Sequence, residues 1–93
     1  MDLHTLFFLK EMISILKTTP SSIILQVDGK TLKVLGESFV RGYGSPDFII
    51  DVASIKFWEK PHDAISITKE ESDYIVQYLL DELRRRNWDV IAE

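Results

Sequence analysis

The feature that most constrains the fold is the dipeptide Asp28-Gly29, which separates two runs of β-forming residues. These runs, 22–27 and 30–35, are rich in isoleucine, leucine and valine. A two-residue Asp-Gly loop favours a type I′ turn, because both central positions of that turn need positive φ. The turn then fixes the pairing register and places Leu25 opposite Leu32 on an apolar face. The sequence therefore predicts a β-hairpin with one buried face.

The residues after the hairpin contain further candidate strands. Residues 36–40 are predicted to continue the second hairpin strand past a bend at a glycine. A loop is expected over residues 42–46 and a third strand over residues 47–51. Residues 52–58 fit either a continuation of that strand or one helical turn. Residues 88–91 fit a short final strand or an apolar strap.

Two helices are predicted, one toward each end of the chain. The first covers about residues 3–17, because Asp2 is a suitable N-cap and apolar side chains follow at helical spacing. The second starts after Thr68, whose hydroxyl can form a capping box with Glu71, and Asn87 can end it in a left-handed conformation. The core-facing stripe of this second helix is expected to contain Ile75, Leu79 and Leu83.

These elements predict an α+β fold in one domain that spans residues 1–93. The expected architecture is a small antiparallel sheet, built from the hairpin and further short strands, with the N-terminal helix and the amphipathic C-terminal helix packed on it. A chain of this length should expose about 5,500 Å² when folded, which leaves room for one modest core. Trp58 is expected in that core, and Pro61 is expected to fix the link into the second helix.

Few residues in the sequence could support catalysis or metal binding. Cysteine is absent, and the two histidines, His4 and His62, lack a second ligand at the spacing of a zinc site. The sequence contains no recognisable nucleophile, phosphate-loop or dinucleotide motif. We therefore expect no enzymatic activity, no cofactor and no bound metal.

The charge balance favours a basic partner over nucleic acid. Eleven basic and fifteen acidic side chains give a net charge of −4, and such a surface repels phosphate backbones. No run reaches the roughly 18 apolar residues that a membrane span needs. No basic region precedes an apolar stretch as it does in a secretory signal. We expect a cytoplasmic protein.

One combination of segments resembles a known family. Gly36-Glu37 follows the hairpin, residues 48–50 make an apolar strand, and Trp58 and Pro61 precede an acidic helix. In this order the segments resemble the immunity protein 74 family, whose relatives neutralise bacterial polymorphic or contact-dependent-inhibition toxins. The resemblance covers roughly residues 22–83.

The resemblance implies a non-catalytic antitoxin that binds the catalytic domain of a cognate toxin, expected to be a basic nuclease, and blocks its active site. Core strands and helix faces are unavailable for such contacts, which leaves loops and exposed acidic side chains. An exposed tyrosine can anchor an interface, and carboxylates can pair with basic groups of a catalytic cleft. The expected toxin-contacting residues are Glu37, Tyr43, Asp47, Glu59, His62 and Asp63.

Two alternative functions fit parts of the same sequence. A small structural or regulatory subunit could form homo-oligomers through the wide apolar arc of its N-terminal helix. A nucleic-acid-binding module could use Lys30, Lys33 and the arginines at positions 84–86. The sequence leaves open the activity of the toxin and the oligomeric state of the free protein.

Overall fold

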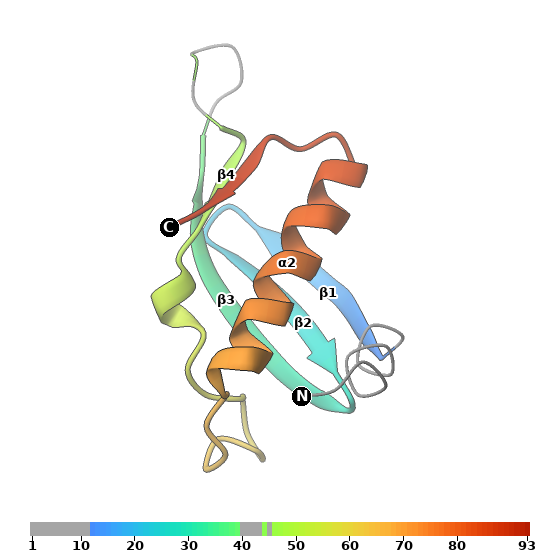
Figure 1. The fold of residues 1–93 in the computed structure, drawn as a ribbon, viewed down its shortest axis with the longest axis vertical. Coiled ribbons are helices and arrows are strands. Elements are labelled where there is room, and N and C mark those ends of the chain that lie inside the picture. Colours follow the sequence, from blue (N-terminus) through green and yellow to red (C-terminus); the bar gives the residue numbers. More distant parts are fainter. Residues whose placement is uncertain (1–11, 40–43, 45) are drawn as a thin grey trace.

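The structure, a computed structural model, describes residues 12–39, 44 and 46–93. In these residues a five-stranded sheet with the order β1-β2-β3-β4-β5 is covered on one face by a single α-helix, α2 (Figure 1). The α+β class predicted from the sequence is confirmed. The helix α2 covers Lys69–Arg85, and a 3-10 turn, η1, covers Val52–Ser54. The strands are β1 (Ile13–Thr19), β2 (Ser22–Val27), β3 (Lys30–Ser38), β4 (Phe48–Ile50) and β5 (Val90–Ala92).

The predicted β-hairpin is confirmed in its turn and in its register. Asp28 and Gly29 have φ values of 49° and 77°, as a turn with two positive φ angles requires. The register places Leu25 opposite Leu32, and both side chains are fully buried. The turn chemistry and the apolar pattern therefore specify the same pairing.

The prediction of a helix over residues 3–17 is wrong from residue 13 onward, where the chain forms β1 and pairs antiparallel with β2. Residues 3–11 of that helix lie outside the described residues. The spacing that fitted a helix also fits a strand with one β-bulge. Ile13 and Ile15 alternate toward the core, and the register then shifts at Leu16, whose side chain is exposed. The open edge of β2 offers hydrogen-bonding groups to this segment, and its β-branched residues favour the strand conformation.

The expectation of a purely antiparallel sheet is also wrong, because β5 runs parallel to β4. Parallel neighbours need a crossover connection. Here the crossover contains α2, which carries the chain across one face of the sheet between β4 and β5 (Figure 1). Phe48 pairs with Val90 and Ile50 pairs with Ala92 in this register. The predicted final segment is therefore a strand, and it lies at the edge of the sheet.

The segment 52–58 begins as a helical turn and not as an extension of β4. The carboxylate of Asp51 caps η1 by accepting a hydrogen bond from Ala53 N at 3.1 Å. The hydroxyl of Ser54 accepts a hydrogen bond from Leu35 N at 3.0 Å. These bonds attach the turn to β3.

The C-terminal helix has the predicted ends and the predicted core stripe. Thr68 Oγ1 accepts a hydrogen bond from Glu71 N at 3.1 Å, and Glu71 Oε1 accepts one from Thr68 N at 3.0 Å, which completes the capping box. Asn87 follows the helix with a φ of 66°, in the left-handed region. The residues of α2 that are fully buried in the core are Ile75, Leu79 and Leu83.

The strand β3 continues through Gly36, as predicted, and changes its partner there. Residues before this glycine pair with β2, and residues from Gly36 onward pair with β4. A Cβ atom built on Gly36 would lie 2.5 Å from the carbonyl oxygen of Ile49 and closer still to the ring of Phe48. The ring of Phe48 is fully buried. It therefore packs against backbone that has no room for a side chain.

We predict that Gly36→Ala lowers the free energy of unfolding by roughly 1–3 kcal/mol, the usual cost of overpacking a core. The added methyl group has to displace Phe48 or the backbone of β4. Urea denaturation followed by circular dichroism measures the loss. Ser38→Ala, at the exposed end of the same strand, is the control. Equal denaturation midpoints for the two variants would contradict the close approach.

Candidate functional site

The face of the sheet opposite α2 leaves apolar side chains accessible to solvent where β3, β4 and β5 meet. Leu35 is 45% exposed and Ile91 is 37% exposed, whereas their inward-pointing neighbours Val34 and Val90 are at most 1% exposed. Strand side chains alternate between the two faces of a sheet. The exposed residues therefore share the face that α2 does not cover.

The pairing register arranges this face in two adjacent rows. Glu37 lies opposite Ile49, and Ile49 lies beside Ile91, so these three residues form the first row. The second row lies two residues farther along β4 and β5, because Asp51 N donates a hydrogen bond to Leu35 O at 2.9 Å and the chain of β5 continues to Glu93. We call the two rows the open strip. Its residues are Leu35, Glu37, Ile49, Asp51, Ile91 and Glu93.

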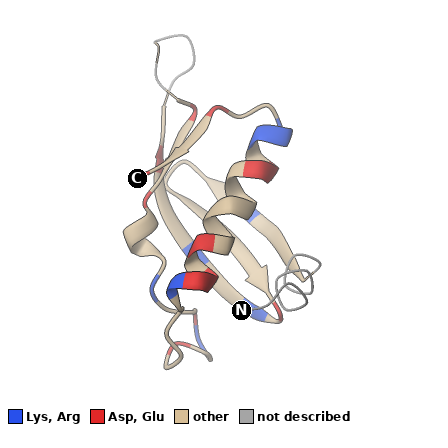
Figure 2. Ribbon diagram, viewed as in Figure 1, with Lys and Arg blue, Asp and Glu red and all other residues tan. Residues whose placement is uncertain are grey.

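The open strip contains a shallow hollow with an acidic rim. The hollow has a volume of about 400 Å³, and its lining includes Leu35, Ile49 and the three acidic residues of the strip. Among the described residues, neither Glu37 nor Glu93 forms an ion pair. Figure 2 shows acidic segments at this end of the sheet and along α2, and basic segments at both ends of α2. The hollow is therefore suited to a cationic group from another molecule.

The predicted contact residues of the first half of the chain have different positions in the fold. Glu37 is exposed and belongs to the open strip. Asp47 lies just before β4 and is partly buried, and its Oδ2 accepts a hydrogen bond from Asp89 N at 2.8 Å. This bond ties β4 to the chain that enters β5, which gives Asp47 a structural role. Tyr43 lies outside the described residues.

The predicted contact residues of the second half lie at the other end of the molecule, in the loop that leads into α2 (Figure 1). Glu59 and Asp63 are exposed, and His62 is partly buried. The loop is folded back on itself, because His62 N donates a hydrogen bond to Glu59 O at 3.0 Å. It is also tied to β3 by a bond of 2.8 Å from Glu59 N to Thr31 O. The structure therefore does not bring these three residues together with Glu37.

Trp58 occupies the core, as the sequence predicted. Its side chain is 3% exposed, and Lys30 Nζ lies 5.2 Å from the centroid of its ring, within the range of a cation–π contact. The next residue toward the N-terminus, Phe57, is 58% exposed. Trp58 is therefore unavailable to a partner, and Phe57 is available.

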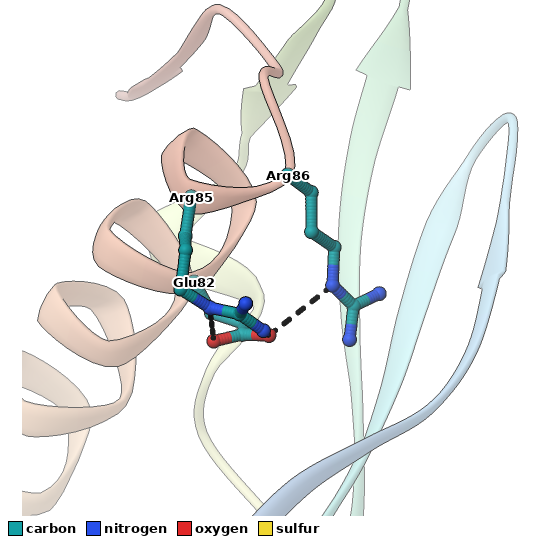
Figure 3. Close-up of polar contacts among 3 residues, drawn as sticks. All are labelled: Glu82, Arg85 and Arg86. Atoms are coloured by element: carbon teal, nitrogen blue, oxygen red, sulfur yellow. Dashed lines mark hydrogen bonds and ion pairs between the residues drawn. The ribbon is translucent and has the colours of Figure 1, made fainter.

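The arginines at the end of α2 are engaged within the protein. Glu82 accepts hydrogen bonds from Arg85 Nε at 3.0 Å and from Arg86 Nε at 3.2 Å (Figure 3). Arg84 Nη2 donates a hydrogen bond to Val90 O at 3.2 Å. The hydrogen bond from Arg85 is the main cause that holds the pKa of Glu82 below the ordinary value of 4.5. This arrangement fits the basic end of a helix better than a phosphate site.

The open strip was only partly accessible to sequence reasoning. Of its six residues, only Glu37 is among the contact residues predicted from the sequence, and Leu35, Ile49, Asp51, Ile91 and Glu93 are not. The alternation of apolar and acidic residues at 49–51 and 91–93 was visible in the sequence. These two segments form one surface only because β4 pairs in parallel with β5. That pairing joins residues far apart in the sequence, so local patterns do not predict it.

The described part of the chain contains neither a metal-binding cluster nor a membrane-spanning helix. No group of three or more histidine or acidic side chains there is arranged to hold a metal ion. No helix among the same residues is long and apolar enough to span a membrane.

Comparison with known proteins gives one match. A family model described as immunity protein 74 matches residues 15–93 of this chain. The match includes every strand from β2 to β5 and the whole of α2. No curated protein and no solved structure matches the chain.

We predict that Trp58→Ala lowers the free energy of unfolding by roughly 3–5 kcal/mol, as the truncation of a buried aromatic residue does. Phe57→Ala is the matched control and should change stability by about 0.5 kcal/mol or less, because its side chain is exposed. Chemical denaturation followed by tryptophan fluorescence or circular dichroism measures both changes. A Trp58 variant as stable as the Phe57 variant would show that Trp58 is not part of the core.

We predict that Glu82→Gln weakens the fold at neutral pH and makes little difference in acid. The folded-state pKa of Glu82 is lowered, so its stabilising contribution is present above the ordinary pKa and is lost as pH falls below it. Unfolding free energies at several pH values between about 7 and 3 should therefore fall less steeply in the variant. The same change in a protein that already carries Arg85→Gln and Arg86→Gln is the control. An identical effect in both backgrounds would mean that the arginines do not lower the pKa.

Proposed function

This chain belongs to the immunity protein 74 family and is an immunity protein against a toxin; from this membership we propose that it acts by binding over the toxin's catalytic site. We further propose that the toxin domain is basic and acts on nucleic acid. The observation that carries this proposal is the acidic hollow of the open strip, where Glu37 and Glu93 have no ionic partner among the described residues.

The acidity of the whole chain supports the same partner. The net charge is −4, and a nuclease cleft that holds phosphate groups carries lysine and arginine. Complementary charge speeds the encounter of two proteins and selects the orientation in which they meet. Attraction between the acidic face and a basic cleft would therefore orient the two proteins so that this face meets the catalytic site.

A blocking role requires little of this protein beyond a complementary surface. A standard interface takes about 800 Å² from each partner, roughly an eighth of the 6057 Å² of this chain. Inhibition by coverage involves no bond making or breaking by the inhibitor. We therefore propose that the protein is non-catalytic and acts in the cytoplasm, where it would meet the toxin.

The structure gives less support to the rival function, a subunit that forms oligomers through an N-terminal helix. The predicted helix was to present its apolar arc over residues 3–17, and residues 13–17 belong instead to β1. Two residues of that segment, Ile13 and Ile15, are packed with the core of this same chain. The toxin-blocking function is the one that the family and the charge distribution support together.

The proposed function is tested with the catalytic domain of the cognate toxin. Purified protein should form a one-to-one complex with that domain and abolish its nuclease activity at equimolar concentration. The substrate of the toxin, bound first at high concentration, should slow complex formation because both compete for the same cleft. A complex that leaves the toxin fully active would contradict the proposal.

We predict that Glu37→Lys weakens toxin binding by about tenfold, corresponding to about 1.4 kcal/mol, mainly through a slower association rate. The matched variant is Glu59→Lys, which makes the same exchange at an exposed position at the opposite end of the molecule. Surface plasmon resonance at low and high salt measures both rates. Asp63→Lys and Arg84→Glu extend the series to the loop and to the end of α2.

The series separates three contact surfaces. A loss confined to Glu59→Lys and Asp63→Lys would place the toxin at the loop that also holds His62. A loss of toxin affinity confined to Arg84→Glu would contradict binding at the acidic surface, although the proposed immunity function would still hold. Tyr43 remains a predicted contact, and Tyr43→Ala tests it in the same assay.

A further inference from the structure

We infer that the toxin docks flat on the open strip, with Ile49 and Ile91 buried at the centre of the interface and an arginine or lysine of the toxin seated in the acidic hollow. This inference rests on the proposed function, since it takes a basic toxin domain as the occupant. It adds the face, the apolar centre and the chemistry of the residue that the hollow receives.

The apolar centre follows from the register of the sheet. Ile49 and Ile91 are direct neighbours across the parallel pair, and Leu35 on β3 lines the same hollow as Ile49. Leu35 and Ile91 remain 45% and 37% exposed in the free protein. Protein interfaces combine an apolar centre with a polar rim. The open strip has this composition, because its three remaining residues are acidic.

The hollow has the chemistry of a receptor for a cationic side chain. Glu37, Asp51 and Glu93 all line it. The Asp51 carboxylate is positioned at the rim by the hydrogen bond that it accepts from Ala53 N at 3.1 Å. A guanidinium group can bond to two carboxylates at once, and the ammonium of lysine can do so with less directional preference.

The strip is also rigid, which lowers the entropy cost of binding. Its residues belong to β3, β4 and β5 or directly follow them. The inward-facing residues of the same strands, Phe48, Ile50 and Val90, are at most 1% exposed and anchor the strands in the core. The outward-facing residues are therefore held in position before the partner arrives.

Charge distinguishes the open strip from the two other hollows of the described surface. One hollow, of about 490 Å³, lies on the other side of Leu35, and its lining includes the exposed Phe57, one carboxylate, Glu59, and two lysines, Lys33 and Lys56. Its lysines would repel a basic domain. The other, of about 340 Å³, lies along α2 and includes the Glu82–Arg85 ion pair, so its charge is partly neutralised from within. The lining of the hollow in the open strip, by contrast, contains three carboxylates, the exposed Leu35 and no lysine or arginine.

The first test replaces the apolar centre while keeping β-branched side chains in the strands. The double variant Ile49→Thr, Ile91→Thr should raise the Kd for a catalytically inactivated toxin domain by about tenfold or more, mostly through faster dissociation. Phe57→Thr removes an exposed apolar side chain from the lysine-lined hollow and is the matched control. Its Kd should stay within about twofold of the wild type. Urea midpoints of all variants establish that they are folded.

The second test uses the unaltered protein, so it does not depend on the stability of a variant. Methyl-labelled isoleucine is observed by NMR as the inactivated toxin domain is added. The signals of Ile49 and Ile91 should shift or broaden, and the signal of Ile65, which is 51% exposed in the loop before α2, should not. Glu37→Gln with Glu93→Gln should also reduce the salt dependence of the association rate.

The outcomes separate the inference from the function on which it rests. Binding by the double variant with unchanged Kd, together with unmoved Ile49 and Ile91 signals, would overturn the docking face while the toxin is still inhibited. Shifts confined to Ile65 would place the toxin on the loop and would also overturn it. A wild-type protein that neither binds nor inhibits the toxin domain would overturn the proposed function itself.

Discussion

The fold depends on the contact between Gly36 and the ring of Phe48. At this point β3 leaves β2 and takes β4 as its partner, and the ring of Phe48 fills the space that a side chain on Gly36 would occupy. The ring also lies against Trp88, with centroids 6.3 Å apart and planes tilted by 50°. One buried residue therefore links the hairpin, the short strand β4 and the chain that leaves α2. The position of β5, and with it the open strip, follows from this contact.

The parallel pairing of β4 and β5 gives the protein a composite surface. Ile49 and Ile91 are neighbours although they lie 42 positions apart in the sequence, with α2 between them. The carboxylate of Asp47 adds a bond to Asp89 N where the two strands begin. A surface of this kind exists only in the folded protein, because no short peptide of the sequence contains both of its halves. The docking that we propose on this surface therefore requires the folded domain.

Local signals in the sequence were sufficient for the hairpin and for α2, and insufficient for β1 and β5. The Asp28-Gly29 turn and the Thr68–Glu71 capping box are specified by neighbouring residues, so chain patterns identify them. β1 was mistaken for part of a helix because one β-bulge shifts its alternation toward helical spacing. The site followed the same division. Glu37 is a predicted contact on the basis of its own segment, whereas Asp51, Ile91 and Glu93 come to lie near it only through the parallel register of β4 and β5.

The alternation of side chains along β3, β4 and β5 separates two kinds of sequence freedom. Inward positions such as Phe48 and Val90 are fixed by packing, and a change there alters the whole core. Outward positions such as Ile49 and Ile91 contribute little to that core, so a substitution there would alter the docking that we propose at a small cost in stability. Adjacent residues of one strand thus have separate roles, one in the core and one on the surface. A lineage could acquire a new toxin specificity by exchanging alternate residues on three short strands, without rebuilding the domain that supports them.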